Sequence, residues 1–406
     1  MSVKRRSIIF IFITVMVDVI GFGIIIPVMP TLIENLTGKG ISEASAYGGL
    51  LMVSFALMQF LFSPVLGELS DKYGRRPIIL ISLLGLFFDY LLHAFAPTIM
   101  WLFIGRILAG ICGASYTTAN AYIADISSQE DKAKNFGLLG AAFGFGFIIG
   151  PAIGGIFGNI DVRLPFFIAA GLSLANFLFG YFFVPESLDE ENRREPILKN
   201  MIPGVSIAHV GRFAGLGLLI FALFLANVAG QSLPAIWSFF TVEVYDWNEA
   251  QIGYSLSFVG LLVAFVQGGL IGVLVKKLGQ EKVIIGGFIL WSIGMFLFSF
   301  ATQSWMLYAI LVPYALGGVA GPTLQGLLSN SVSVKEQGNL QGAITSLMSL
   351  TTIIGPAIAT SLFYFFTVDK DGVYFPGAPY TASAIILMIA TVCVVFGMRR
   401  FKKSRG

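Results

Sequence analysis

Long apolar stretches alternate with short polar segments along the whole chain. Twelve of these stretches are apolar over about twenty residues or more, the length that a helix needs to cross a hydrocarbon layer of about 30 Å. They run approximately over residues 8–30, 46–68, 77–96, 98–123, 134–158, 164–184, 212–235, 249–275, 282–301, 304–328, 338–366 and 380–398. The pattern predicts an all-α membrane protein with twelve transmembrane helices.

The composition agrees with this pattern. Of the 406 residues, 56% are hydrophobic and only 12% are charged, too few for the surface of a soluble domain of this size. A β-barrel would need stretches of about ten residues with alternating polarity, whereas these are continuous and twice as long. Lys4, Arg5 and Arg6 resemble the start of a secretory signal, but the following apolar run is long, lacks a small-residue cleavage site and contains Asp18. We therefore expect a retained first helix.

The distribution of basic residues predicts the orientation. With both termini inside, 21 of the 25 Lys and Arg residues fall in cytoplasmic segments, and only Lys39, Arg163 and Lys370 fall outside; Arg106 lies within a helix. Positively charged flanks resist translocation, so we expect a multi-pass protein of the cell membrane with both termini cytoplasmic. The net charge of +3 needs no nucleic-acid partner.

The longest polar segment divides the chain into two similar halves. It predicts an N-terminal six-helix bundle at 1–184, a cytoplasmic linker at 185–212 and a C-terminal six-helix bundle at 213–406. An internal repeat agrees, because six pairs share one offset of 205 residues: Gly48 and Gly253, Gly67 and Gly272, Gly74 and Gly279, Gly137 and Gly342, Gly150 and Gly355, Pro151 and Pro356. Two pseudo-symmetric bundles around a central site are typical of secondary transporters.

Three ionisable residues lie deep inside predicted helices: Asp18, Asp89 and Arg106. Such a residue at the centre of a membrane helix costs about 2.5 to 3.5 kcal/mol in insertion assays, so we expect all three to face a cavity or one another. A carboxyl that is buried in one state and near a positive charge in another can bind and release a proton. The three are candidates for proton coupling. The alternative is a permanent ion pair with Arg106, or, for Asp89, a bond to a backbone group.

Uncharged polar groups can line the same cavity. Gln59, Asn120, Gln231 and Gln267 are candidates for substrate binding, although each alone can equally be a hydrogen-bond partner between helices. His93 follows Asp89 by one turn, and its place near a helix end favours an interfacial position.

The loop after the second helix carries the most specific motif. It reads Gly-Glu-Leu-Ser-Asp-Lys-Tyr-Gly-Arg-Arg-Pro over residues 67–77 and resembles the signature loop of the major facilitator superfamily. Gly67 and Gly74 are expected to permit close helix approach and a tight turn. The resemblance implies a conformational latch in which Asp71, Arg75, Arg76 and Asp125 take part. The plain alternative is a basic loop with solvated charges. The second half has Lys276 in place of the aspartate.

Two further segments resemble the superfamily. Leu-Phe-Ile-Gly-Arg at 102–106 is followed by Ala-Gly at 109–110, and the run at 144–155 resembles the helix 5 motif of drug/proton antiporters. In this run Gly146, Gly150 and Gly154 let backbones approach closely, while Pro151 removes one helical hydrogen bond. Ordinary transmembrane packing is the alternative explanation.

The chain resembles the tetracycline/proton antiporters along nearly its whole length, as shown at residues 18–30, 88–92, 230–235 and 337–342. This resemblance implies the major facilitator fold and proton-coupled export of tetracycline-like or other amphipathic drugs by alternating access, in a bacterial inner membrane and as a monomer. The sequence departs from the family in helix 9, where Trp291 replaces an acid, and in helix 8, where Val263 stands in place of a histidine. We therefore expect Trp291 to contribute to a broader substrate site.

The sequence gives less support to other functions. A proton-coupled symporter or facilitator of a small nutrient or metabolite with the same fold is the main alternative, and the direction of flux distinguishes it. An intramembrane enzyme needs a catalytic set, but the only histidines, His93 and His209, lie in different halves. Cys112 and Cys393 lie in apolar helices, and no Gly-Lys-Ser or Gly-Lys-Thr phosphate loop occurs. We expect no metal and no cofactor, with a proton gradient as the energy source.

Overall fold

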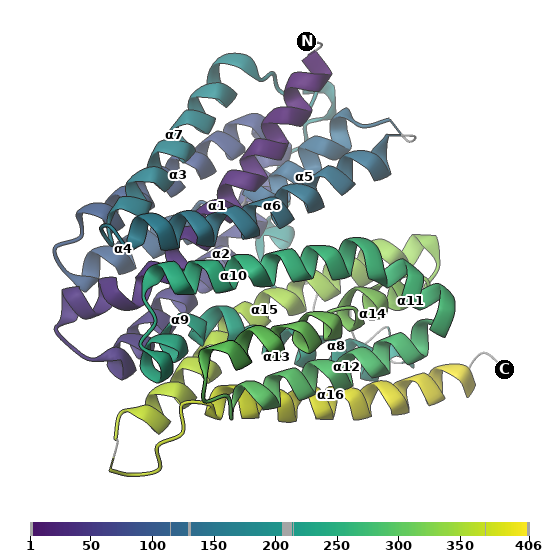
Figure 1. The fold of residues 1–406 in the computed structure, drawn as a ribbon. Helices are drawn as coiled ribbons and strands as arrows, with labels where there is room; N and C mark the ends of the chain where they lie inside the picture. Colours follow the sequence, from purple (N-terminus) through teal and green to yellow (C-terminus); the bar gives the residue numbers. More distant parts are fainter. Residues whose placement is uncertain are drawn as a thin grey trace. The chain divides into compact units, whose positions relative to one another are not determined.

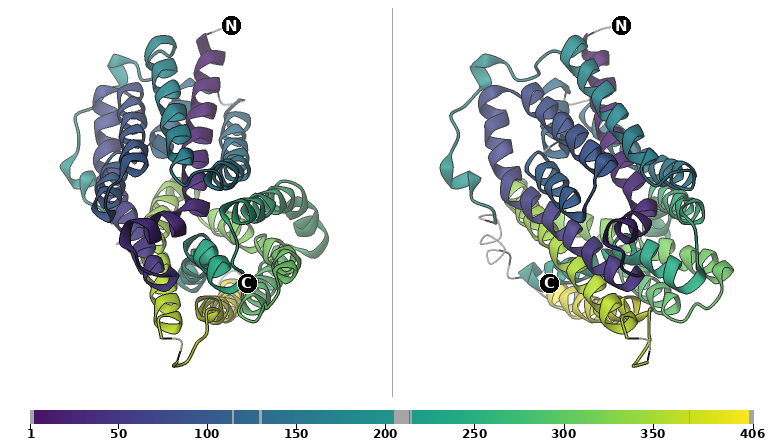
Figure 2. Two further views of the ribbon diagram at one scale, coloured as in Figure 1. Left: turned by 60° about the vertical axis from the view of Figure 1, so that its left-hand side comes forward. Right: turned by 90° about the vertical axis from the view of Figure 1, so that its left-hand side faces the viewer.

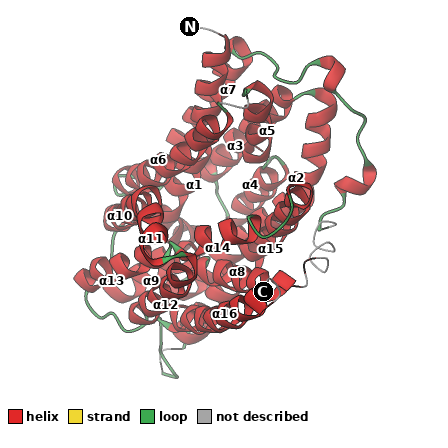
Figure 3. Ribbon diagram, turned by 90° about the vertical axis from the view of Figure 1, so that its right-hand side faces the viewer, coloured by secondary structure: helices red, strands yellow, loops and turns green. Residues whose placement is uncertain are grey.

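The computed structural model describes residues 3–113, 115–128, 131–204, 213, 215–369 and 371–403. Within these ranges the chain is helical and contains no strand (Figure 3). Twelve spans are long and apolar enough to cross a membrane. The predicted all-α architecture with twelve transmembrane helices is therefore confirmed.

The helices are labelled in Figure 1. Their bounds are α1 Val3–Thr37, α2 Ile41–Tyr73, α3 Arg75–Phe95, α4 Ile99–Ile111, α5 Ser115–Ile126, α6 Lys132–Gly158, α7 Leu164–Phe183, α8 Gly217–Gly230, α9 Ser232–Tyr245, α10 Glu249–Phe265, α11 Ile271–Leu278, α12 Gln280–Phe298, α13 Ser304–Gly317, α14 Ala320–Ser329, α15 Val334–Thr367 and α16 Ala378–Lys403. Short helical turns η1 (Glu190–Asn192) and η2 (Leu198–Met201) lie in the linker, and a π-helical turn η4 (Val266–Leu270) joins α10 to α11.

The described chain forms two compact units. Unit 1 contains residues 1–39, 54–203 and 247–260, and unit 2 contains residues 40–53, 204–246 and 261–406. Helices α2 and α10 each contribute segments to both units. The division into bundles at 1–184 and 213–406 with a linker at 185–212 stays a prediction, and residues 205–212 of that linker lie outside the described residues.

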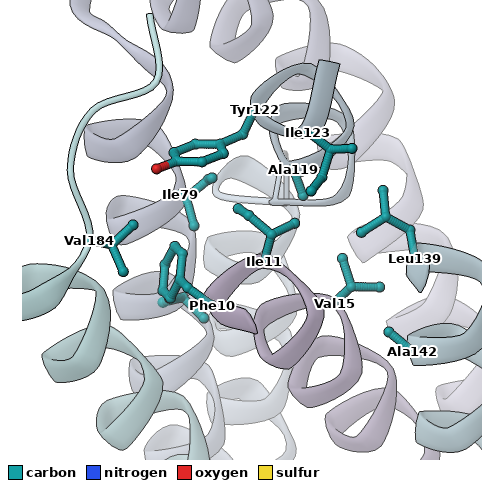
Figure 4. Packing of buried hydrophobic residues seen from close by; sticks show 11 residues of the cluster. Phe10, Ile11, Val15, Ile79, Ala119, Tyr122, Ile123, Leu139, Ala142 and Val184 are labelled. Carbon is teal, nitrogen blue, oxygen red and sulfur yellow. The ribbon is translucent and has the colours of Figure 1, made fainter. Parts of the chain in front are cut away.

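In unit 1, α1 packs along α6 and also contacts α5 and α7 (Figures 1 and 2). Small residues permit this approach, because a Cβ atom on Gly150 of α6 would lie 2.6 Å from the carbonyl oxygen of Ile20. Figure 4 shows the apolar cluster where α1, α3, α5 and α6 meet; its buried members include Phe10, Ile11, Val15, Ile79, Ala119, Ile123 and Leu139. The glycine contacts set the distance between helices, and the cluster fills the space beside them.

Unit 2 is built on contacts of α16 with α8 and α12, and of α12 with α13. Its interior is aromatic. Trp237 is fully buried and meets Phe298 edge to face at 5.4 Å between ring centroids, and Phe240 meets Tyr380 in the same way at 5.1 Å. Such edge-to-face pairs contribute about 0.5 to 1.5 kcal/mol each beyond the area that they bury.

The 205-residue repeat has a counterpart in the backbone. Gly74 and Gly279 both adopt positive φ, +103° and +80°, at the turn that follows the second span of each half. The fourth span breaks between α4 and α5 at Gly113, and the tenth span breaks between α13 and α14 at Gly318. At these breaks Gly113 N–H donates to the carbonyl of Gly110 and Gly318 N–H to that of Ala315, at 3.1 and 3.0 Å. Equivalent positions of the two halves thus interrupt their helices in the same way.

Candidate functional site

Asp18 lies in α1 with both carboxylate oxygens buried, and neither makes a hydrogen bond among the described residues. One turn along α1, a Cβ atom on Gly21 would collide with the hydroxyl of Tyr90 from α3, so this face of α1 is closely covered. The predicted alternative of an ion pair between Asp18 and Arg106 is absent. Asp18 is a buried acid without a compensating cation, which is costly to keep ionised.

Asp89 and Arg106 form an ion pair between α3 and α4. Arg106 Nε donates to Asp89 Oδ1 at 3.2 Å, and Arg106 Nη2 contacts Oδ2. The Asp89 side chain is fully buried and Arg106 is nearly so. The guanidinium also lies 5.5 Å from the centroid of the Phe55 ring. The two charges neutralise each other inside the unit, so removal of either one leaves a buried charge unpaired, at a cost of several kcal/mol.

His93 joins this pair; its predicted interfacial position stays a prediction, but the exposure that a helix end suggests is not found. The side chain is fully buried. Its Nδ1 lies 2.8 Å from the carbonyl oxygen of Asp89 and 3.2 Å from Asp89 Oδ1. The ring stacks on Phe166 of α7 at 5.3 Å. A position near a helix end does not imply exposure where another helix covers that end.

The expected latch residues come together at the end of α2. Arg75 contacts Asp71 through Nη1, and its Nε donates to Asp125 Oδ2 of α5 at 3.1 Å. Glu186 accepts from the backbone N–H groups of Arg75 and Arg76, at 2.8 and 3.1 Å, and so caps the N-terminus of α3. A Cβ on Gly74 would collide with this carboxylate. The tight turn expected at Gly74 is present, and it brings Glu186 against the helix start.

The surroundings of Gly67 differ from those that the sequence predicted. No atom lies within 4 Å of a Cβ built there, so the close helix approach predicted at this position does not occur. Gly67 instead borders a cavity of about 300 Å³, lined by Pro64, Gly67, Glu68, Ser70, Asp71, Arg75, Thr117, Thr118 and Ala121. The charged latch therefore has open space between α2 and α5.

Charges of the linker bind to the same end of α2. Arg194 contacts Asp71 through Nε at 2.9 Å and through Nη2, and its backbone N–H donates to the Asp71 carbonyl at 3.2 Å. The Asp71 carboxylate raises the pKa of Arg194 above its usual range. Lys72 pairs with Glu195 at 2.8 Å, and Ile197 N–H donates to Glu68 at 2.8 Å. Asp71 is thus shared between Arg75 and Arg194.

The amide candidates differ in their surroundings. Gln59 of α2 donates to the carbonyl of Gly113 at 2.9 Å, at the break of the fourth span. Asn120 donates to Tyr116 O of its own helix at 2.8 Å. Gln231 stands at the junction of α8 and α9 and packs against Gly355 of α15, while Gln267 is exposed in the π-helical turn. Within the described residues, Gln59 is the one of the four whose hydrogen bond joins different spans, which the sequence offered as the alternative to cavity lining.

Trp291 lies in α12 and packs within unit 2. Its backbone and Cβ lie against Gly317, since a Cβ on that glycine would be 2.5 Å away, and its ring lies 3.1 Å from a Cβ built on Gly230. It meets the ring of Tyr314 edge to face at 6.2 Å. The Trp291 side chain and backbone thus pack against glycines of α8 and α13.

The helix 5 motif packs on α1. Built Cβ atoms on Gly146, Gly150 and Gly154 would lie 2.7, 2.6 and 2.4 Å from Val19, Ile20 and Ile24. Pro151 lies within α6 without ending it. The motif therefore determines the position of α1, which carries Asp18.

Comparison with known proteins agrees with these motifs. The family model of the Major Facilitator Superfamily matches residues 11–271 and 268–405. This chain belongs to the Major Facilitator Superfamily. Within it, the chain is 41% identical over 360 residues to the tetracycline resistance protein, class C, of Escherichia coli, covering 89% of this chain and 90% of that protein. It is 36% identical over 400 residues to the class H protein of Pasteurella multocida, covering 98% and 97%.

Solved structures of the superfamily share the fold. A bacterial homologue of the human lysosomal transporter Spinster, in an inward-facing and occupied conformation, has a TM-score of 0.79 at 16% identity, covering 99% of this chain and 98% of that chain. The human organic anion transporter MFSD10 has a TM-score of 0.72 at 20% identity, covering 97% and 100%. At these identities the likeness shows the fold alone.

Three residues that contact the end of α2 or the start of α3 were not predicted from the sequence. Glu186 and Arg194 belong to the predicted cytoplasmic linker and Glu68 to the motif at 67–77, and none of the three was predicted to contact the latch residues. Their charge and their place beside a span end were visible. Which of the many linker charges would reach the latch depends on the path of the folded linker, and no spacing rule gives that path.

Proposed function

We propose that this superfamily member is a proton-coupled secondary transporter that exports tetracycline-like and other amphipathic drugs by alternating access. The observation that carries the proposal is the 41% identity over 89% of the chain to a tetracycline resistance protein. The buried carboxyl groups in unit 1 supply groups that protons can bind. The fold alone would suit many substrates, so the drug class rests on the relatives and the coupling on the site.

Asp18 is the proposed site of proton exchange. A buried carboxylate without a cationic partner favours its protonated form, and either a proton or a positive group of a drug can neutralise it. In the proposed cycle, drug binding from the cytoplasm is coupled to release of the proton from the carboxyl oxygen, and the opposite opening returns a proton as drug leaves. Competition for one negative charge gives antiport.

We propose that the Asp89–Arg106 ion pair takes part in the same transport cycle by responding to protonation. Protonation of Asp89 removes the charge that balances Arg106, and the uncompensated guanidinium then favours a conformation in which it reaches water or another acceptor. Protonation of Asp89 thereby changes the relative stability of two conformations of the transporter. Gln59, Asn120, Gln231, Gln267 and Trp291 are proposed to line the substrate site.

The latch is proposed to control the exchange of conformations. Gly67, Asp71, Gly74, Arg75 and Asp125 lie at one end of α2, and Arg76 follows there with its guanidinium on the carbonyl oxygens of Gly180 and Tyr181. We propose that this end faces the cytoplasm, as the distribution of basic residues predicts. We further propose that the chain resides in a bacterial inner membrane with both termini cytoplasmic, works as a monomer and needs no cofactor. One proton moving through 100 mV releases about 2.3 kcal/mol, which supports a drug gradient of roughly fifty-fold at about 1.36 kcal/mol per decade.

The test is transport in everted membrane vesicles. With an imposed proton gradient, acid inside, tetracycline is expected to accumulate inside the vesicles and to dissipate the gradient at a matching rate. Accumulation must vanish when an uncoupler removes the gradient. Movement of substrate and proton in the same direction would show the symporter alternative instead, and no response to a panel of amphipathic drugs would refute drug export.

A further inference from the structure

His93 is a buried titratable group that the coupling scheme above does not use. Its Nδ1 faces two oxygens of Asp89, the backbone carbonyl at 2.8 Å and Oδ1 at 3.2 Å. Its Nε2 is buried and makes no hydrogen bond within the described ranges. Phe166 stacks on the ring from α7. Nδ1 is therefore the ring nitrogen with polar neighbours, and both of these neighbours belong to Asp89.

This geometry fixes the form of the ring. A carbonyl and an ionised carboxylate both accept hydrogen bonds, so the hydrogen must be on Nδ1. A second proton on Nε2 would place a positive charge beside Arg106, with one carboxylate for two cations and no acceptor for the new N–H. The ring is neutral, with Nδ1–H as the donor, while Asp89 and Arg106 are paired.

The charged groups around His93 are few. Asp89 lies on its own helix and Arg106 comes from α4. Arg163, just before α7, donates to the carbonyls of Ala94 and Ala96 at 2.9 and 2.8 Å. Helix α5 places its acid, Asp125, with Arg75 in the latch. The Asp89 carboxyl is therefore the group that His93 can influence directly.

Gly105 of α4 brings the pair and the histidine together. A Cβ built on it would lie 2.5 Å from Asp89 Oδ1 and 3.1 Å from His93 Nδ1. The backbone of α4 thus backs the carboxylate oxygen that lies beside the imidazole Nδ1, and the carboxylate has little room to rotate. Arg106 holds the carboxylate from one side and His93 from the other.

We propose that His93 is a positioning residue for the Asp89 carboxylate: its Nδ1–H donates to the Asp89 carbonyl and lies 3.2 Å from Oδ1, and this positive edge of the ring favours the ionised acid and so sets the pH range in which the Asp89–Arg106 pair exchanges its proton. The proposal rests on the proposed proton coupling through this pair. An N–H dipole held close to a carboxylate favours the charged acid over its protonated form, so its loss moves proton exchange to higher pH.

Two variants of equal shape test the proposal. Asn places an amide N–H near the position of Nδ1, whereas Leu has the same branching and no donor. In everted vesicles, the pH profile of tetracycline-dependent proton flux is expected to be unchanged in His93→Asn and to shift upward by about one pH unit in His93→Leu. Identical profiles of the Asn and Leu variants would overturn the proposal. A wild type without drug-dependent flux at any pH would contradict the proposed function as well.

A second measurement does not depend on transport or on the Leu variant. The chain has two histidines, so in His209→Asn the remaining ¹⁵N-histidine signal belongs to His93. We expect the neutral Nδ1–H tautomer at neutral pH, and a change of its Nδ1 shift in Asp89→Asn. An Nε2–H tautomer or a cationic ring would overturn the proposal.

Discussion

At the scale of single residues, the buried charges differ in their neighbours, and these neighbours determine what protonation does. Arg106 has one carboxylate partner, Asp89, and Asp18 has no cation beside its buried oxygens. Protonation therefore has opposite consequences at the two acids. Protonation of Asp18 relieves an unfavourable charge, whereas protonation of Asp89 breaks a favourable pair.

Asp18→Asn mimics the protonated carboxyl permanently. We expect it to abolish uphill, proton-driven tetracycline transport while leaving measurable drug binding, because the amide keeps the shape but cannot exchange a proton. Vesicle transport and equilibrium binding of purified protein are the two measurements, with Asp18→Glu as the control that restores an acid. Full uphill transport by the Asn variant would remove Asp18 from the mechanism.

Trp291 tests the proposed substrate site. Trp291→Ala removes aromatic contact worth about 0.5 to 2 kcal/mol per cation–π pair and opens a hole against Tyr314 and Gly230. We expect lower resistance to every exported drug in an exporter-deficient host, with normal values in Trp291→Phe at equal protein levels. Loss confined to tetracyclines would contradict a broad aromatic site.

At the scale of elements, α1 and α6 are held by a row of glycines. Gly150→Ala pushes a methyl group against the Ile20 carbonyl, whereas Gly144 in the same helix has nothing within 4 Å of a built Cβ. We expect Gly150→Ala to destabilise the protein by about 1 to 3 kcal/mol and Gly144→Ala to be neutral or stabilising by up to about 1 kcal/mol. Denaturant midpoints in detergent compare the two, and equal midpoints would contradict the packing argument.

The end of α2 is the element through which the linker meets the latch. Asp71→Asn weakens its contacts with both Arg75 and Arg194 without touching the Asp89–Arg106 pair. We expect turnover to fall about tenfold, a change of about 1.4 kcal/mol in the barrier, with little change in drug affinity. Lys72→Gln, which breaks the exposed pair with Glu195 and the contact of the ammonium with the Tyr73 ring, should leave both values near wild type. A large loss of affinity at unchanged turnover would speak against a latch.

At the scale of the whole molecule, the sequence predicted every span because an apolar run of about twenty residues is a local signal. It missed the ends of helices. The seventh span was expected to end at residue 235 but continues to Tyr245, since polar residues such as Thr241 bond back to their own helix through Trp237 O at 2.9 Å. A hydroxyl satisfied in this way does not end a helix.

The candidate site residues show the same difference between local and long-range signals. Asp18, Asp89 and Arg106 stand out because a charge inside an apolar run is costly wherever it points. Their pairing does not, because it depends on which faces of α3 and α4 meet. His93 shows the limit most clearly: its sequence position suggested the interface, and only the covering ring of Phe166 reveals a buried partner of Asp89.

The orientation of the whole molecule is the remaining prediction, and it rests on 21 basic residues on one side against three on the other. In a background with Cys112 and Cys393 replaced by alanine, Asn159→Cys lies in the loop between α6 and α7, and Asp189→Cys lies in the linker; both positions are exposed. In intact cells, a membrane-impermeant maleimide is expected to label the first variant fully and the second only after lysis. Labelling of Asp189→Cys from outside would invert the topology, place the latch on the outer face and reverse the direction assigned to drug transport.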